Sequence, residues 1–173
     1  MGEALKFLGF DQEKLDGQTI YKKLVGYNFI IYLFAGAYRK YGGIMVDPIL
    51  HLDYLPLKQK MTEEEERTGQ VLSTNACHFG IQYCSLDDLY EKRWSEGDFI
   101  EVGASVKNAV DTVVWTMETY ALPLIMKYTT KDALRKLYED AISLSFHRHI
   151  ITMDEKRKLS ALNEMEQEQR KVP

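Results

Sequence analysis

Apolar side chains recur every three to four positions along much of the chain, a spacing that predicts amphipathic helices. The first run extends from Leu24 to Tyr38 and contains no charged residue. Because apolar residues also occupy the opposite side of such a helix, we expect a central helix that is buried on most of its sides. Its apolar face, which begins just before the run, consists of Ile20, Leu24, Tyr27, Ile31, Phe34 and Tyr38.

A membrane-spanning segment is the alternative interpretation of this run. Its fifteen residues would extend about 22 Å as a helix, whereas the hydrocarbon core of a bilayer is about 30 Å thick. Flanking cations at Lys22, Lys23, Arg39 and Lys40 can extend the reach of such a helix towards the interface. A single periodic face is needed in a protein core and not in lipid, so the core helix is favoured over a membrane contact.

Further helices are predicted where a residue that favours helix N-termini precedes a run of apolar positions. Thr62 and Glu65 form one such capping box, and Thr152 and Glu155 form another. Pro123 is expected to kink or end the long apolar helix in which it lies. The predicted helices cover residues 62–83, 85–94, 99–124, 129–149 and 152–173.

Two details of this assignment stay open. The fourth of these helices begins at either Thr129 or Thr130, both of which favour a helix start. Between Gly42 and Lys60 the chain forms either a short helix or an extended crossing. The inward side chains of the fourth helix are expected to be Leu134, Leu137, Tyr138, Ala141 and Leu144.

These elements predict the all-α fold class. No repeat, linker or low-complexity block divides the chain, and its 173 residues suffice for one core. We expect a single compact helical domain of five to seven helices over residues 1–150, followed by a polar C-terminal helical extension over residues 151–173. The extension has few apolar side chains to bury, so we expect it to be mostly solvated or to await a partner.

The charge pattern argues against one class of partner. The net charge is −4, whereas a nucleic-acid-binding surface needs clustered Lys and Arg. Charge is unevenly distributed: residues 61–128 carry a net charge of −7, and the segments on either side are slightly positive. We predict that the chain binds no nucleic acid and that its middle third forms an acidic, solvated surface.

The cysteines and the N-terminus bear on the compartment. Cys77 and Cys84 would lie roughly 10 Å apart on one helix, too far for a disulfide. Free thiols are typical of a reducing compartment. The N-terminal residues include charged side chains from Glu3 onwards and do not form a signal peptide. We therefore expect a protein of the cytoplasm or of another reducing compartment, and not a secreted one.

Two segments, taken in order, resemble the last part of a globin. Phe99, Val102, Gly103 and Val106 are similar to the globin residues where a short haem-contacting helix gives way to a long one. Weaker similarity extends upstream to the second and the distal globin helices. The resemblance implies a globin-like helical fold. The segments concerned are residues 33–38, 67–72, 86–110 and 133–146.

The resemblance also implies a set of cofactor-binding residues. A globin holds haem iron with a proximal histidine, but the matching position here is Tyr90. Tyrosinate ligates haem iron in some enzymes, and His78 is the rival axial ligand. Arg67 falls near the distal position and Val71 lies one helical turn further on. Haem is thus the cofactor under this alternative, and otherwise we expect none.

Motifs that carry catalytic or metal-binding chemistry are not recognisable. The four histidines and two cysteines do not have the spacing of a zinc site. Asp111 and Glu118 share a predicted helix face and could act as an acid–base pair, but Lys107 one turn earlier favours a surface ion-pair stripe. Glu118 lies in an apolar context, so its pKa would rise if it were buried.

We therefore predict that the chain is not an enzyme. The favoured function is a non-enzymatic helical protein that acts through protein–protein contacts, as an assembly subunit, adaptor or regulator. Seven methionines and eleven tyrosines are consistent with this, because interfaces are enriched in both residue types. Other protein subunits are the expected partners, and a homo-oligomer is kept open. The alternative function is a globin-like protein that binds haem or another apolar small molecule.

Overall fold

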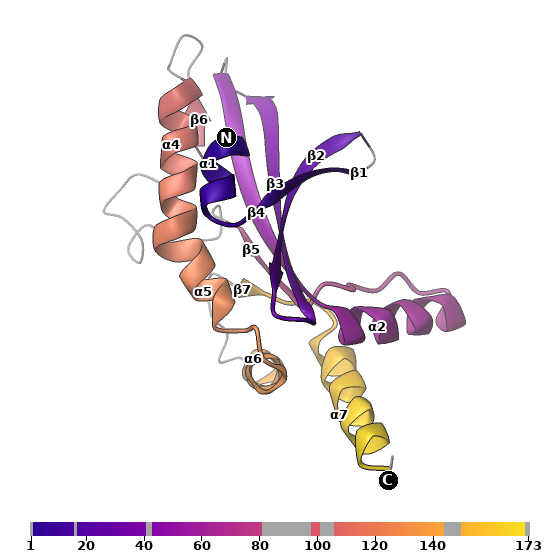
Figure 1. The fold of residues 1–173 in the computed structure, drawn as a ribbon. Coiled ribbons are helices and arrows are strands. Elements are labelled where there is room, and N and C mark those ends of the chain that lie inside the picture. Colours follow the sequence, from indigo (N-terminus) through magenta and orange to yellow (C-terminus); the bar gives the residue numbers. More distant parts are fainter. Residues whose placement is uncertain are drawn as a thin grey trace.

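The computed structural model describes residues 2–15, 17–40, 43–80, 98–100, 106–143 and 150–171, which form a mixed α/β fold. Strands dominate the first half of the chain and helices the second (Figure 1). The all-α fold class and the helical bundle are therefore wrong, and the globin-like arrangement with them. In chain order the elements are α1 (Gly2–Phe7), β1 (Asp11–Leu15), β2 (Gln18–Val25), β3 (Phe29–Lys40), β4 (Gly43–Tyr54), α2 (Leu55–Thr68), β5 (Cys77–Gly80), β6 (Asp98–Ile100), α4 (Val106–Thr116), the π-helical turn η2 (Met117–Ala121), α5 (Leu122–Met126), α6 (Lys131–Ile142), β7 (Ile150–Ile151) and α7 (Glu155–Lys171).

The strands form one antiparallel sheet, which has seven strands in the described part of the chain. Its order is β1-β2-β3-β4-β5-β7, and β1 to β4 follow one another as a meander. The long strand β4 has two different neighbours on its far side. Its C-terminal half pairs with β5 at residues 49–52, and its N-terminal half pairs with β6 at residues 44–46.

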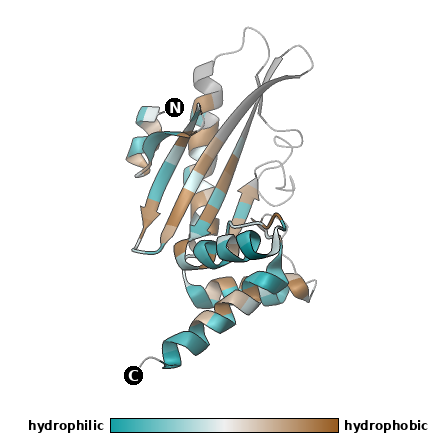
Figure 2. Cartoon of the chain, turned by 90° about the vertical axis from the view of Figure 1, so that its right-hand side faces the viewer, coloured by the Kyte–Doolittle hydropathy of each residue, from teal (hydrophilic) through white to brown (hydrophobic). Residues whose placement is uncertain are grey.

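One face of the sheet is covered by helices and the other is more open. α4 runs alongside the strands and continues through η2 into α5, while α6, α7 and α2 lie at the lower end of the sheet (Figure 1). Figure 2 shows the sheet with α4 behind it and with the largely hydrophilic helices α2 and α7 below. We refer to the face of the sheet opposite α4 as the open face.

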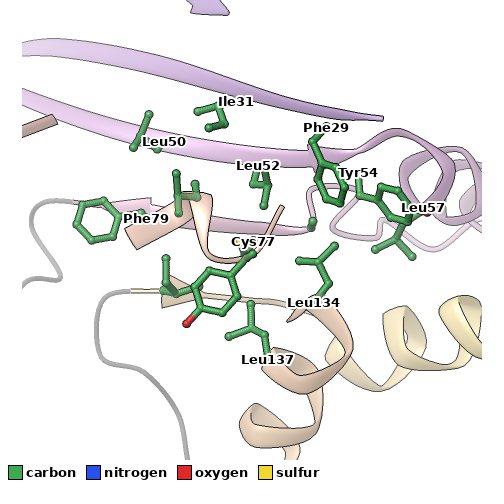
Figure 3. Close-up of a cluster of buried hydrophobic side chains, with 14 of the residues drawn as sticks. Phe29, Ile31, Leu50, Leu52, Tyr54, Leu57, Cys77, Phe79, Leu134 and Leu137 are labelled. Carbon is green, nitrogen blue, oxygen red and sulfur yellow. The ribbon is translucent and has the colours of Figure 1, made fainter. Parts of the chain in front are cut away.

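The core lies between the sheet and the helices on its covered face. Because side chains alternate along a strand, every second residue from 29 to 33 in β3 and from 50 to 54 in β4 points into it. In Figure 3 these side chains meet those of α6. The Tyr138 hydroxyl donates a hydrogen bond to the carbonyl of Ala76 at 2.9 Å, which ties α6 to the start of β5. The core includes Phe29, Ile31, Leu33, Leu50, Leu52, Phe79, Val113, Met117, Ile125, Leu134, Leu137 and Tyr138.

The uncharged run from Leu24 to Tyr38 is the turn and second strand of a hairpin, so the central helix is a wrong prediction. Gly26 has a φ of 62°, which glycine adopts without strain, and it opens the turn between β2 and β3. The run is rich in β-branched and aromatic residues, which favour strands. Since almost every position is apolar, a helical stripe can be traced through it by coincidence. None of the helices in the described ranges combines the length and apolar character that a membrane crossing requires.

The helix predicted over residues 62–83 is wrong in both of its boundaries. α2 begins at Leu55, with Pro56 in its first turn, where the missing N–H of proline costs nothing. It ends at Gly69, which adopts a left-handed conformation with a φ of 67° and donates its N–H to the carbonyl of Glu65. The chain then crosses to β5, so Cys77 belongs to a strand.

The later helices agree better with the expectation. Helical structure covers Val106 to Met126 and continues past Pro123. The predicted start at Phe99 is wrong, because that residue belongs to strand β6. Thr130 is the residue that caps α6, because its hydroxyl accepts a hydrogen bond from the N–H of Ala133 at 3.2 Å. Of the five side chains expected to point inwards from this helix, Leu134, Leu137 and Tyr138 are buried and Ala141 is half-buried. Leu144 lies outside the described residues. The helix predicted over residues 85–94 lies outside the described residues.

α7 packs on the rest of the chain. Leu162 is fully buried, and ion pairs connect the helix to its neighbours: Lys60 of α2 contacts Glu168 at 2.7 Å, and Arg135 of α6 contacts Glu166 at 2.6 Å. Although the segment is polar, its apolar side chains and its carboxylates thus have partners within this chain.

Candidate functional site

A row of polar and aromatic side chains crosses the open face of the sheet. Strand register places Lys22 opposite Tyr32, Tyr32 opposite His51, and His51 opposite His78. The neighbouring residues along these strands, such as Leu33 and Leu52, are fully buried in the core. The row therefore faces the other way, with adjacent Cβ atoms about 4.5–5.5 Å apart.

The rings in and beside this row contact one another. Phe34 lies one step along β3 on the same face, and its ring centroid is 4.7 Å from that of His51. The His51 and His78 centroids are 5.7 Å apart. Tyr32 and Phe34 are in looser contact at 6.3 Å. These rings form a continuous aromatic strip over β3, β4 and β5.

A groove of about 230 Å³ opens on this face. Four of its lining residues are apolar or aromatic, and they come from β1, β2 and β3: Leu15, Ile20, Tyr32 and Phe34. The other five are polar or charged, and most come from β4, α2 and the segment before β5: Glu13, His51, Asp53, Lys58 and Asn75.

Asp53 is the most unusual residue in the groove, because its carboxylate is buried. The residue has no exposed surface. Its Oδ2 accepts a hydrogen bond from Lys58, while its Oδ1 receives none from any residue that the structure describes. Burial raises the pKa of Asp53, and the hydrogen bond from Lys58 opposes this shift. A carboxylate oxygen without a donor is costly to bury.

Lys58 reaches Asp53 because α2 follows β4 without a loop. Asp53 is the second-last residue of β4, and Lys58 is the fourth residue of α2. The Lys58 ammonium also lies 5.7 Å from the ring centroid of Tyr32, within the range of a cation–π interaction. The lysine therefore contacts both the acid and the aromatic wall of the groove.

His51 is held in its neutral form. Burial lowers its pKa to about 4, and the neighbouring His78 and Lys58 add to the shift. Asn75 Nδ2 lies 3.1 Å from His51 Nδ1. If the amide donates to that nitrogen, the single proton of the neutral ring is on Nε2. The pKa of His78 is also lowered, first by burial and then by Lys158.

A second buried polar group lies behind the row, at the start of α7. Lys158 is fully buried and donates a hydrogen bond to the Ser73 hydroxyl at 3.2 Å. Burial lowers the pKa of Lys158 to about 8. Burial also raises the pKa of the nearby Cys77 thiol to about 12, which leaves the thiol protonated and unreactive at neutral pH.

Three of the predicted haem-binding residues lie in the described part of the chain, and the structure does not bring these three into one groove. His78 lies in the row on the open face. Arg67 lines a different groove, of about 350 Å³, between α2 and α7, and Val71 is 90% exposed. Tyr90 lies outside the described residues, so haem binding through it stays a prediction. Glu118, singled out in the sequence in case it was buried, is exposed on η2.

Four residues of the site were not predicted from the sequence: Asp53, Lys58, Asn75 and Tyr32. One pattern could have revealed part of the site. In residues 50–54 the apolar side chains alternate with His51 and Asp53, which is typical of a strand with one polar face. The contributions of Lys58 and Asn75 depend on how α2 and β5 pack against the sheet, and no local pattern indicates that.

Neither a protein-family model, nor a curated protein, nor a solved structure gives a significant match to this chain. Within the described ranges, no three His, Cys, Asp or Glu side chains gather so that they could hold one metal ion. Functional inference therefore starts from the geometry of the open face.

Proposed function

We propose that the protein acts by binding another protein, without catalysing a reaction, and that its contact surface is the open face of the sheet around the groove. The observation that carries this proposal is the groove itself. It combines aromatic walls with a buried carboxylate oxygen, Asp53 Oδ1, that receives no hydrogen bond from the described residues.

The size of the groove favours a protein partner over a small molecule. Pockets for drug-sized ligands measure about 300–1,000 Å³, whereas this groove measures about 230 Å³. A recess of this size suits one inserted side chain. Protein interfaces commonly gain most of their affinity from a few such anchoring side chains in well-packed pockets.

The surface beside the groove is also apolar. Leu24 is 63% exposed on the open face, and strand register places it in line with Ile30 and Asp53. Tyr27, in the adjoining turn, is 97% exposed. Exposed aromatic and aliphatic side chains around a buried anchor site are typical of interface cores.

Two titratable groups in and near the site, His51 and Cys77, are unsuited to acid–base or nucleophilic chemistry at neutral pH. A general base works best when its pKa is near the operating pH. The pKa of His51 is about 4, and that of Cys77 is about 12. Neither group is suited to proton transfer or nucleophilic attack at neutral pH.

A reducing compartment such as the cytoplasm is the proposed setting. Cys77 is a free thiol in the core, and free buried cysteines persist where disulfides do not form. The acidic surface predicted from the sequence is compatible with this setting but does not identify it.

The test compares two surface variants. Leu24→Glu places a charge on the open face, and Val71→Glu places the same charge at a residue that is 90% exposed and does not line the groove. We expect tagged wild-type protein and Val71→Glu to retain one partner at stoichiometric amounts, and Leu24→Glu to lose it. Size-exclusion chromatography with light scattering shows whether that partner is a second copy. A monomer that retains no protein, or a partner that Leu24→Glu retains fully, would contradict the proposal.

A further inference from the structure

We propose that the groove on the open face binds a guanidinium group, presented by an arginine side chain of the partner protein. This inference rests on the proposed function and identifies the side chain that anchors the contact. It is carried by three features of the groove: its bare acceptor, its aromatic walls and its charge.

The acceptor is Asp53 Oδ1. Asp53 is one of the residues that line the groove, although it has no exposed surface, and its buried Oδ1 receives no hydrogen bond from the described residues. A carboxylate accepts several hydrogen bonds, and Lys58 supplies one of them to Oδ2. The group that completes this site must therefore donate a hydrogen bond, and a cationic donor gives the strongest one.

The walls favour a planar cation. Tyr32 and Phe34 line the groove, and the Lys58 ammonium already lies 5.7 Å from the Tyr32 ring centroid. A guanidinium is planar and weakly hydrated, and it stacks on aromatic rings while its N–H groups bind a carboxylate. Its alkyl stem can lie along Leu15 and Ile20, the apolar residues at the other side of the groove.

The charge balance is compatible with an incoming cation. Asp53 and Lys58 neutralise each other, as do Glu13 and Lys22 at a separation of 3.2 Å. The neutral imidazole of His51 adds no positive charge at neutral pH. Glu13 is about half exposed at the rim, and Lys58 is 40% exposed. Lys58 therefore has room to move aside when a second cation approaches Asp53.

The surroundings attract a basic partner. α2, which begins beside the groove, carries the four glutamates Glu63 to Glu66 against two lysines and one arginine, a net charge of −1, and the whole chain has a net charge of −4. Charge complementarity of this kind accelerates the encounter with a cationic partner. An arginine in a basic segment of the partner fits both the groove and its surroundings.

The experiment uses capped amino acids as probes for the partner's side chain. N-acetyl-arginine amide is titrated into the ¹⁵N-labelled protein and followed by NMR. N-acetyl-citrulline amide has nearly the same shape as the arginine probe without its charge. N-acetyl-lysine amide has the same charge without a planar guanidinium group. We expect saturable shifts in Tyr32, Phe34 and Asn75 with the arginine probe, and at least about tenfold weaker binding of the other two. Equal binding of citrulline and arginine would overturn the inference.

Substitutions test whether the carboxylate of Asp53 and the aromatic wall of the groove bind the arginine probe. Asp53→Asn and Phe34→Leu are each expected to weaken the binding of the arginine probe by about tenfold. Because Asp53 is buried, Asp53→Asn could fail to fold. Glu13→Gln, at an exposed rim position, is then the second variant and is expected to weaken binding by about threefold. Unchanged affinity in Phe34→Leu together with unchanged affinity in Glu13→Gln would overturn the inference.

Two further outcomes separate this inference from the proposed function. If free L-arginine binds more tightly than the capped residue, the groove serves a small molecule, and the assignment to a partner side chain is wrong. If Leu24→Glu loses its protein partner while the wild type binds no arginine probe, the proposed function stands and the guanidinium assignment fails.

Discussion

Lys58 and Asp53 form an ion pair that joins the end of β4 to the first turn of α2. The two side chains differ sharply in exposure: the carboxylate is 1% exposed and the lysine 40%. The buried carboxylate of Asp53 is therefore stabilised by an ion pair with a lysine that solvent can reach. Because of this difference in exposure, replacing Lys58 removes the counter-charge of the buried carboxylate from its exposed side.

We predict that Lys58→Met destabilises the protein. Removing the lysine leaves a buried carboxylate without its counter-charge, and breaking a fully buried pair costs about 3–5 kcal/mol. Because Lys58 is partly exposed, and because Asp53 can take up a proton, the expected loss is smaller, about 2 kcal/mol at neutral pH. Urea unfolding followed by circular dichroism measures the change.

Lys136→Met on the exposed side of α6 is the control for this variant, and we expect it to shift stability by less than about 0.5 kcal/mol. The double variant Asp53→Asn/Lys58→Met should recover part of the loss, because position 53 then carries no buried charge. A Lys58→Met protein as stable as the control would contradict the ion-pair account.

Stability should also depend on His51 in mild acid. The pKa of His51 is about 4 in the folded protein, below its ordinary value of 6.5. Between these pH values the unfolded chain binds more protons, so folding stability falls as pH decreases from 6.5 to 4 and is unaffected by this group above 6.5. His51→Gln should reduce the loss across this window by up to about 3 kcal/mol. Parallel pH profiles of wild type and His51→Gln would show that the imidazole is not buried.

The helices of the second half could be predicted because the signals that specify them are local. Thr130 caps α6 through its own side chain, and the apolar stripe of that helix follows from residues three and four positions apart. The hairpin from Gln18 to Lys40 is different, because both faces of β3 carry apolar residues. Ile31 and Leu33 face the core, while Ile30 is also buried although it lies on the open face. A continuous apolar run does not distinguish strand from helix.

The candidate site could not be predicted from local patterns because sequence-distant residues build it. Asn75 contacts His51 across 24 positions, and Glu13 and Asp53 line the same groove from different strands. Their proximity depends on the register of four strands, which no single segment specifies. The polar residues His51 and Asp53, alternating with leucines in β4, are the part of the site that the sequence could have indicated.

Lys158→Met is predicted to stabilise the protein at neutral pH. The lysine is fully buried and its pKa is about 8, below its ordinary value of 10.5. The cost of burying its charge is therefore present in full below pH 8 and is relieved as pH rises from 8 to 10.5. The carboxylates of Asp53, Asp154 and Glu155 oppose this shift, as does the Cys77 thiol. An apolar residue of similar length should gain about 1–3 kcal/mol at pH 7.

The pH profile distinguishes this effect from better packing. The stability advantage of Lys158→Met should shrink between pH 8 and 10.5, because the wild type loses its penalty there. Chemical denaturation at several pH values measures the difference between the two proteins, in which the titration of other lysines cancels. An advantage that stays constant up to pH 10.5 would mean that the charge of Lys158 is not responsible.

Two threonines with similar sequence contexts should differ in their contribution to stability. Thr130 accepts the N–H of Ala133 at the start of α6, and replacing such a cap with alanine costs about 1 kcal/mol. Thr62 begins a capping box in the sequence, yet it lies within α2, where its hydroxyl donates to the carbonyl of Lys58 at 3.0 Å. Alanine at that exposed helical position should be neutral or slightly stabilising, because it removes a competitor for backbone hydrogen bonds. Thermal unfolding of Thr130→Ala and Thr62→Ala compares the two directly. A larger loss at Thr62 would indicate that the helix begins there, as the local pattern suggests, and not at Leu55.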